Sequence, residues 1–406
     1  MSERLRVAID ARLRVGASGG VETVVIGIAQ GFAELAPDDL DLTFLGYEDA
    51  DDWLAPHLGP SRLVRVPSRS LTRGGLRRAT DAMATLSSGL LGGPRHVPSS
   101  VALRRDYEMN RLDVDLVHYP YQASCLPDRP FLYQPHDLLH VHHPELLRQD
   151  QVRRREMHYA AMCERAALVV VGTRWVRDDV RDYFKLPPER LRVIPLAPPR
   201  RTAGSAELPG GLPPHYLLYP AANWPHKNHA KLIAALAVCW HGGVEVELVL
   251  TGPRLAAFPD PVGIAESLDV SDHVHDLGYL DEATLARVYE HARGVVVPTQ
   301  FESASFPIWE AFETGIPVAC SSVTALPEQV GKGAVLFDPE DVPAMSAAMS
   351  LLWTDDSVRT ALVAAGRERV GDFTWLRTAQ RLADAYRAVG TGGVPGRDAE
   401  LTAEVF

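Results

Sequence analysis

Segments typical of buried strands alternate with segments typical of amphipathic helices along this chain, and this alternation restricts its fold more than any other feature. In the first half, "RVAIDA" (6–11) precedes "GGVETVVIGIAQGFAEL" (19–35), whose apolar residues share one helical face. The strand patterns "LDLTFLGY", "DVDLVHYPY", "PFLYQPHDLL" and "ALVVVGTRW" follow. Alternating βα units predict an α/β fold, with parallel sheets covered by helices on both faces.

A second alternation follows a stretch rich in Pro, Gly and Ala, "RRTAGSAELPGGLPP" (200–214), which is typical of a domain linker. It runs from "YLLYPA" (216–221) to "GAVLFD" (333–338). We therefore predict an N-terminal Rossmann-like domain over 1–199, a linker over 200–214 and a C-terminal Rossmann-like domain over 215–375. A last helix over 376–390 is expected to pack back on the N-terminal domain, and 391–406 to form a flexible tail.

Composition and charge exclude several classes of protein. A chain of 406 residues is longer than a single hydrophobic core usually supports, which also favours two domains. The net charge of −11 argues against a nucleic-acid partner. Four widely spaced cysteines, no signal-peptide pattern and no apolar run of roughly 20 residues predict a cytoplasmic protein.

The stretch "FESASFPIWEAFETGIPVACSS" (301–322) places two glutamates eight positions apart. Glu302 follows the predicted strand "RGVVVPT", and Glu310 is expected in the first turn of a helix that Pro307 opens and Gly315 ends. Open α/β sheets bind ligands at the carboxyl edge of their strands. We therefore expect both glutamates to belong to a ligand site.

This stretch, together with "YPAANWPHKNHAKLIAAL", "HDLLHVHHPE" and the first helix, resembles the retaining nucleotide-sugar glycosyltransferases of the GT-B fold. The resemblance is to the large family that includes bacterial mannosyltransferases and sucrose synthases, and it extends from about residue 7 to 389. Its most specific part is the E-x7-E motif followed by "GIPVACS" and "LPEQVG". It implies two Rossmann-like domains that face a deep inter-domain cleft.

The resemblance also implies roles for residues of the E-x7-E stretch. Glu310 would bind the ribose hydroxyls of the donor nucleotide, and Glu302 the hydroxyls of the donor sugar. The loop containing Ser303, Ser305 and Phe306 would present backbone N–H groups to sugar and phosphate. The family often has glycine where this chain has the two serines. An alternative is that Glu310 only complements the helix dipole.

Lys227 in "NWPHKNH" is expected to neutralise the departing β-phosphate, as a cation between a strand end and a helix N-terminus can. Many family members pair this lysine with an arginine a few residues earlier, but here residues 221–224 read Ala-Ala-Asn-Trp. Either Asn223 keeps a hydrogen bond to the donor without the charge, or another basic residue substitutes. The alternative for Lys227 is an ordinary solvated lysine.

In the first domain, Gly19 and Gly20 match a Gly-Gly of the family that packs close to the donor diphosphate. Their surroundings, "GASGG", lack the G-x-G-x-x-G pattern, which argues against nicotinamide binding. His136 and Asp137 match the family's His-Asp at the acceptor side, and the resemblance implies that His136 would contact the donor sugar or help position the acceptor hydroxyl. The alternatives are a tight turn for the glycines and a structural role for His136.

Two further features concern metals and partners. The triplets at 39–41 and 113–115 read Asp-x-Asp, but both precede strands and are interpreted as solvated turns, so neither a metal nor another cofactor is expected. The segment 61–105 has nine arginines and one acidic residue, Asp81. It predicts an acceptor-side surface, an anionic acceptor or peripheral contact with the inner face of the membrane. The alternative is a mobile insertion with solvated arginines.

The sequence thus predicts a metal-independent retaining glycosyltransferase. Its partners would be a nucleotide-diphosphate-sugar donor and an acceptor hydroxyl on a saccharide, a lipid-linked glycan or a small natural product. The resemblance, not composition, supplies the retaining mechanism. Two alternatives stay open: a GT-B nucleotide-sugar epimerase, and a catalytically silent nucleotide-sugar-binding subunit.

Overall fold

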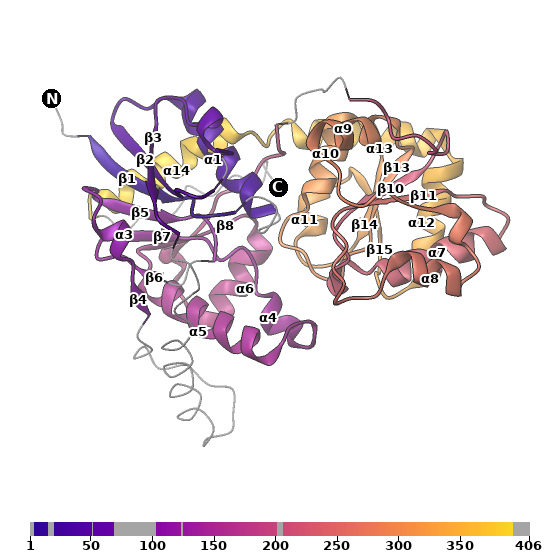
Figure 1. Cartoon of the computed structure of the whole chain (residues 1–406), viewed down its shortest axis with the longest axis horizontal. Coiled ribbons are helices and arrows are strands. Elements are labelled where there is room, and N and C mark those ends of the chain that lie inside the picture. Colours follow the sequence, from indigo (N-terminus) through magenta and orange to yellow (C-terminus); the bar gives the residue numbers. More distant parts are fainter. Residues whose placement is uncertain are drawn as a thin grey trace, which may run out of the picture.

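The chain forms two lobes in the computed structural model (Figure 1). The structure describes residues 4–14, 20–50, 52–68, 103–122, 125–200 and 206–392. Gly19, most of the arginine-rich segment and the tail beyond residue 392 therefore lie outside the described residues. Each lobe is built around one parallel sheet, which confirms the predicted α/β class.

The first lobe contains seven parallel strands in the order β3-β2-β1-β5-β7-β8-β9. These strands are β1 (Leu5–Asp10), β2 (Leu40–Tyr47), β3 (Arg62–Val66), β5 (Leu116–Tyr119), β7 (Phe131–Tyr133), β8 (Leu168–Val171) and β9 (Leu191–Val193). A separate parallel pair joins β4 (Arg104–Arg105) to β6 (Cys125–Leu126). The helices are α1 (Gly20–Leu35), α3 (Tyr107–Asn110), α4 (Leu139–His142), α5 (Gln149–Arg165) and α6 (Arg174–Phe184).

The second lobe contains six parallel strands in the order β12-β11-β10-β13-β14-β15. They are β10 (Leu217–Pro220), β11 (Leu248–Thr251), β12 (Val274–Asp276), β13 (Gly294–Val297), β14 (Val318–Ser321) and β15 (Ala334–Phe337). The helices are α7 (His229–His241), α8 (Pro261–Ser267), α9 (Glu282–His291), α10 (Phe306–Thr314), α11 (Leu326–Val330), α12 (Val342–Thr354) and α13 (Asp356–Val370). Because β10 pairs with both β11 and β13, the loops that leave these three strands are neighbours.

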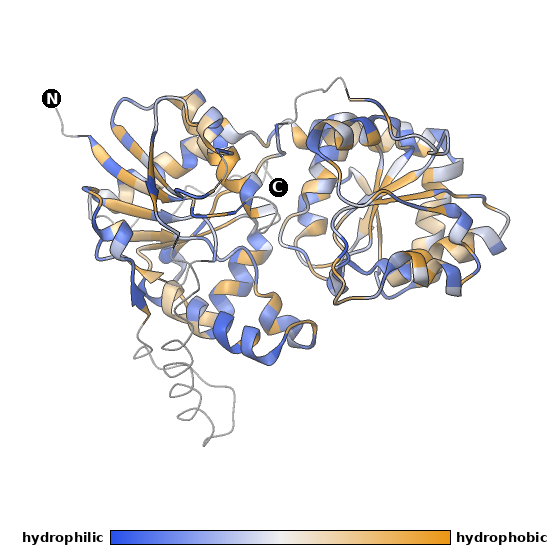
Figure 2. Cartoon of the chain, viewed as in Figure 1, coloured by the Kyte–Doolittle hydropathy of each residue, from blue (hydrophilic) through white to orange (hydrophobic). Residues whose placement is uncertain are grey.

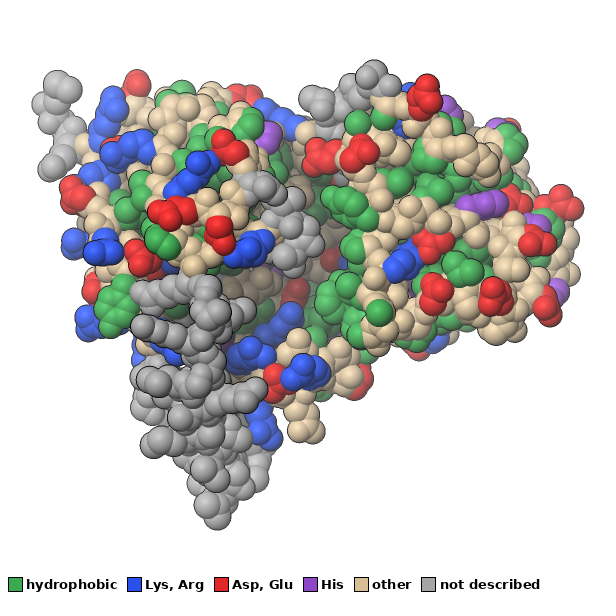
Figure 3. Space-filling view, in the orientation of Figure 1, with side chains coloured by type: hydrophobic (Ala, Val, Ile, Leu, Met, Phe, Trp, Pro, Cys, Tyr) green, Lys and Arg blue, Asp and Glu red, His purple; other side chains and the backbone are tan. Residues whose placement is uncertain are grey.

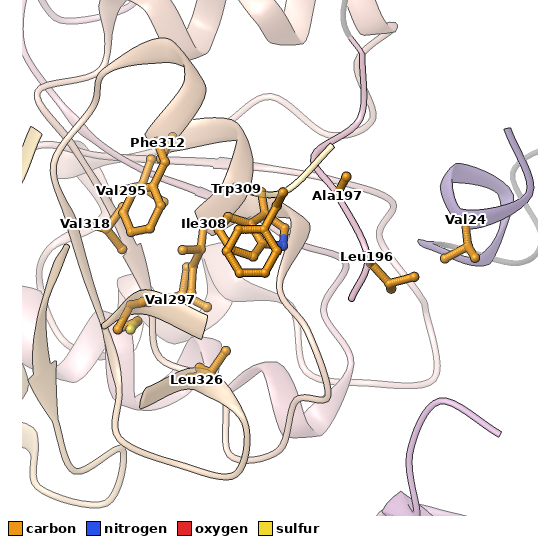
Figure 4. Close-up of a cluster of buried hydrophobic side chains, with 14 of the residues drawn as sticks. Val24, Leu196, Ala197, Val295, Val297, Ile308, Trp309, Phe312, Val318 and Leu326 are labelled. Atoms are coloured by element: carbon orange, nitrogen blue, oxygen red, sulfur yellow. The ribbon is translucent and has the colours of Figure 1, made fainter. Parts of the chain in front are cut away.

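Apolar strands lie inside both lobes, under helices whose outer faces are polar (Figure 2). The core of the second lobe shows how the E-x7-E stretch is anchored (Figure 4). Ile308, Trp309 and Phe312 of α10 are each 3% exposed or less. Ile308 and Phe312 lie toward Val295 of β13 and Val318 of β14, and Trp309 packs against Phe373. This burial fixes α10, the helix that follows Glu302 and contains Glu310, on the sheet.

The last helix, α14 (Trp375–Gly390), returns to the first lobe and lies against α1. The Trp375 indole fits over Gly27, and its Nε1 donates to the carbonyl of Pro198 at 2.7 Å. Tyr386 stacks on Phe32 with ring centroids 5.7 Å apart. The C-terminal helix therefore completes the core of the first lobe.

The carboxylates of the two Asp-x-Asp triplets are solvent-exposed, as predicted, with Asp39 at 56% and Asp113 at 86%, and they also form ion pairs. Arg387 of α14 binds Asp39, Arg62 binds Asp41, and Arg6 binds both Asp113 and Asp115. These carboxylates thus join neighbouring strands and α14 at the amino edge of the first sheet. No helix in the described part of the chain is both long and apolar enough to cross a membrane.

We predict that Gly27→Ala destabilises the protein although alanine is the better helix former. A Cβ at Gly27 would lie 2.0 Å from Cε2 of Trp375, and the Pro198 hydrogen bond holds the indole in place. The clash should cost about 2 kcal/mol, which exceeds the roughly 1 kcal/mol of helix propensity gained. Urea unfolding measures the difference. The control is Gly263→Ala in α8, where a Cβ meets nothing within 4 Å, and equal effects of the two variants would contradict the packing argument.

Candidate donor-binding and catalytic site

Lys227 and Glu302 form an ion pair at the carboxyl edge of the second sheet. Lys227 ends the short 3-10 helix Pro225–Lys227 between β10 and α7, and Glu302 follows β13. Two hydrogen bonds join their loops, because the carbonyl of His226 accepts from Gln300 N at 2.8 Å and from Thr299 Oγ1 at 3.0 Å. The two side chains are 22% and 16% exposed. The structure thus brings together two residues that lie 75 positions apart in the sequence.

Burial and two neighbouring charged residues shift the pKa of Glu302. Burial raises the pKa of its carboxyl above the ordinary value, and the ammonium of Lys227 opposes that shift. Asp137 of the first lobe also raises the pKa of Glu302, so the two lobes meet electrostatically here. In the space-filling view, the surface between the two lobes is hollowed (Figure 3). Asp137 of the predicted His-Asp pair therefore lies close enough to the E-x7-E stretch to act on the charge of Glu302.

His136 has a backbone conformation that is rare for residues other than glycine. Its φ is 67°, in the left-handed region, and such strain is concentrated at functional sites. The ring Nε2 lies 2.9 Å from the carbonyl of Pro120. Since a carbonyl only accepts, Nε2 carries the proton. Burial lowers the pKa of His136, so near pH 7 the ring is neutral and its Nδ1 is a hydrogen-bond acceptor.

Glu310 lies in the second turn of α10, not in the first turn as predicted. The helix begins at Phe306, so Glu310 is its fifth residue and is 7% exposed. Ser305 precedes the helix, and its N–H donates to Gln329 Oε1 at 2.8 Å. A Cβ at Gly20 would lie 3.1 Å from the Phe306 ring, so the start of α1 approaches this loop closely. Gly315 ends the helix at φ 76°, as predicted.

The side chain of Asn223 holds a neighbouring loop. Its Oδ1 accepts from Leu255 N at 2.7 Å, and its Nδ2 donates to the carbonyls of Leu255 and Pro259, both at 3.2 Å. The loop borders a cavity of about 600 Å³. Its lining includes Asn223, Arg254, Phe258, Asp260, Asp276 and Gly278. Direct contact of Asn223 with a donor stays a prediction.

Two contacts between the lobes were not predicted from the sequence. The Glu328 carboxylate of α11 accepts from the backbone N–H groups of Arg174 and Trp175, at 2.7 and 2.9 Å, and thereby caps α6 of the other lobe. Phe301, next to Glu302, is 4% exposed and lies against His142, His143 and Trp175 of the first lobe. Glu328 belongs to the "LPEQVG" motif, but its partner could not be read from sequence.

Family profiles match both halves of the chain. Residues 209–369 match "Glycosyl transferases group 1", and residues 18–197 match "Glycosyltransferase Family 4". Solved structures with the same fold include sucrose-phosphate synthase from Thermosynechococcus elongatus, with a TM-score of 0.67, 20% identity and coverage of 96% of this chain and 100% of that one. Fold and site together define a glycosyltransferase of the GT-B type, as predicted.

Sequence relatives give the family. The chain is 30% identical over 268 residues to O-antigen chain mannosyltransferase B of Escherichia coli, covering 62% of this chain and 68% of that protein. It is 26% identical over 416 residues to MMP alpha-(1->4)-mannosyltransferase of Mycolicibacterium hassiacum, covering 94% and 98%. The chain therefore belongs to the group 1, family 4 glycosyltransferases.

We predict that Lys227→Met loses more stability at pH 7.5 than at pH 5. Burial raises the pKa of Glu302 above its unfolded value, so ionised Glu302 destabilises the folded state as pH rises through the folded pKa. Without Lys227 this pKa rises further. The expected loss at pH 7.5 is about 1–2 kcal/mol, less than for a fully buried pair because both side chains are partly exposed.

Urea unfolding at the two pH values measures this loss. The control is the double variant Lys227→Met/Glu302→Gln, which removes both charges and should recover most of the stability at pH 7.5. A loss of equal size at both pH values would show that the two residues are not electrostatically coupled.

Proposed function

We propose that this glycosyltransferase is a retaining, metal-independent enzyme that moves a sugar from a nucleotide-diphosphate-sugar donor to an acceptor hydroxyl. The observation that carries the proposal is the Lys227–Glu302 pair at the carboxyl edge of the second sheet, close to Asp137 of the first lobe. A cation and a carboxylate are thereby positioned side by side. Transfer from a nucleotide-sugar donor needs a cation at the leaving phosphate and a carboxylate at the sugar.

Lys227 and α7 serve the leaving group in this proposal. As the bond from the sugar carbon to the phosphate oxygen breaks, negative charge grows on the β-phosphate, where a fixed cation stabilises it. α7 begins two residues after Lys227 and has 13 residues, so its N-terminal N–H groups add to the positive potential. Charge stabilisation by these groups is the reason for proposing that no metal is required.

Glu302, Glu310 and His136 position the donor and the acceptor. Glu302 accepts hydrogen bonds from sugar hydroxyls, and Glu310 binds the ribose. The neutral ring of His136 accepts from a hydroxyl through Nδ1. On a single face of the sugar, the acceptor oxygen bonds to carbon as the phosphate oxygen leaves, and the hydroxyl proton passes to that phosphate oxygen. The configuration of the sugar is therefore retained.

The names of some relatives support a proposal for the class of donor and acceptor. The names of two relatives specify mannosyl transfer, which favours a mannosyl donor and a saccharide acceptor. For the arginine-rich segment 61–105, contact with an anionic acceptor or the inner face of the membrane stays a proposal that rests on residues outside those described. The described Arg62, Arg65 and Arg105 pair with Asp41, Asp52 and Asp128. These three therefore support a structural role at the ends of the segment.

A donor screen tests the proposal. Among UDP, GDP, ADP and dTDP, one should raise the melting temperature, because a ligand at 100 times its Kd stabilises by about 2.7 kcal/mol. The mannose derivative of that nucleotide is then incubated in excess EDTA, with and without methyl α-mannoside. We expect nucleoside diphosphate release and a disaccharide whose new linkage keeps the anomeric configuration of the donor.

Each other result identifies a different error. A new nucleotide sugar made without acceptor would indicate an epimerase, and binding without turnover of any donor sugar would indicate a silent subunit. Activity lost in EDTA and restored by magnesium or manganese would contradict metal independence. An inverted linkage would contradict the same-face step.

Steady-state kinetics should separate the two glutamates. Glu310→Ala removes binding to the ribose, which does not change during reaction, so the donor KM should rise more than kcat falls. Glu302→Gln and Lys227→Met act where charge and geometry change, so kcat should fall, by about 10²–10³ for the lysine. An unchanged donor KM in Glu310→Ala, or parental kcat in Lys227→Met, would contradict these roles.

A further inference from the structure

The charge at the site is incomplete for the proposed donor. A sugar-linked diphosphate carries about two negative charges near neutral pH, and the leaving group gains more. Lys227 supplies one positive charge, but it is already paired with Glu302. The pair as a whole is neutral. A further cation next to these loops would therefore strengthen binding of the diphosphate.

Asn223 does not supply the missing donor in this structure. A side-chain amide has two N–H donors. Both are directed to the carbonyls of Leu255 and Pro259. The side chain thus holds the loop after β11 against the loop after β10. The loop after β11 carries an arginine, Arg254.

Within the part of the chain that the structure describes, the guanidinium of Arg254 is held by partners on one side only. Its Nε and Nη2 both donate to the Asp276 carboxylate at the end of β12, and Gly278 N donates to the same carboxylate at 2.9 Å. Its Nη1 is buried and has no hydrogen-bond partner among the described residues. A buried donor without an acceptor costs about 1–3 kcal/mol, so this nitrogen lacks an acceptor that a ligand oxygen would provide.

The position of Arg254 fits a phosphate at the start of α7. Its loop lies close to the chain at 221–222, because a Cβ at Gly252 would come within 2.7 Å of the Ala221 carbonyl carbon. Arg254 also lines the 600 Å³ cavity beside Asn223. Burial lowers the pKa of His229, the first residue of α7, to about 4, and the guanidinium of Arg254 contributes to this shift. Its positive charge therefore reaches the helix N-terminus next to Lys227.

We propose that Arg254, oriented by Asp276, is a second cation that binds the diphosphate of the donor through Nη1. This inference rests on the proposed function, since it assigns a partner to the diphosphate in that site. Arg254 and Lys227 would approach the diphosphate from the adjacent loops after β11 and β10. The bidentate pair with Asp276 keeps the guanidinium in one orientation, so little side-chain freedom is lost on binding.

Calorimetric titration with three probes tests the proposal. The probes are inorganic pyrophosphate, the nucleoside diphosphate that stabilises the parent most among UDP, GDP, ADP and dTDP, and the corresponding nucleoside. In Arg254→Met/Asp276→Asn, which leaves no unpaired carboxylate, affinity for the two phosphate probes should fall about 10–100-fold, as for loss of one charged hydrogen bond. Nucleoside affinity should change less than about twofold.

Two further variants sharpen the test. Arg254→Lys keeps the charge but loses the planar guanidinium that binds Asp276 through two N–H groups. Its affinity for the phosphate probes should therefore fall less than that of the double variant. Arg287→Met on α9 removes an arginine whose guanidinium pairs with neighbouring Glu290, and this variant should match the parent for all probes.

The outcomes distinguish failure of the proposed role of Arg254 from failure of the proposed function. Parental affinity for pyrophosphate and nucleoside diphosphate in the double variant would overturn the role of Arg254. An equal loss for nucleoside and diphosphate would also overturn it, because it would indicate a purely structural residue. If the parent itself binds neither pyrophosphate nor any nucleoside diphosphate, the proposed function fails instead.

Discussion

The site depends on the pairing of three short parallel strands, β11, β10 and β13. Each has four residues, and nearly all of them are buried, so the strands are mainly apolar and carry no charged group. The chain becomes polar only where it leaves the sheet, and parallel strands leave at a common edge. Arg254, Lys227 and Glu302 are therefore neighbours because their strands are, although they come from distant parts of the sequence.

Contacts between the lobes begin at the same edge. Phe301 precedes Glu302 directly, and the first lobe buries it against His142 and Trp175. Glu328 then caps α6, whose first N–H groups would otherwise lack an acceptor. Because Phe301 is next to Glu302, the loop that carries Glu302 is packed directly against the first lobe. The return of α14 to the first lobe adds a second connection between the two halves.

The parts that sequence predicted are those with a local physical signature. Alternating apolar runs predicted both sheets, and the position after a strand predicted Lys227 and Glu302 as residues of one edge. The prediction that Glu310 lies in the first helical turn was wrong, because the helix begins at Phe306 and helix ends are uncertain by one or two residues. Arg254 was not predicted because the orientation of its guanidinium depends on Asp276, which lies 22 positions away on another strand. Glu328 was missed because its partners lie in the other lobe.

The charged residues at this edge also show a tension between stability and function. Burial raises the pKa of Glu302, and a buried nitrogen of Arg254 has no acceptor among the described residues, so both residues cost stability in the free protein. Each cost is reduced by a partner, Lys227 in one case and Asp276 in the other. A diphosphate would satisfy the nitrogen of Arg254 and accept from Lys227 as well. Donor binding would thus offset the desolvation cost of these charges, which is how a preorganised site gains affinity.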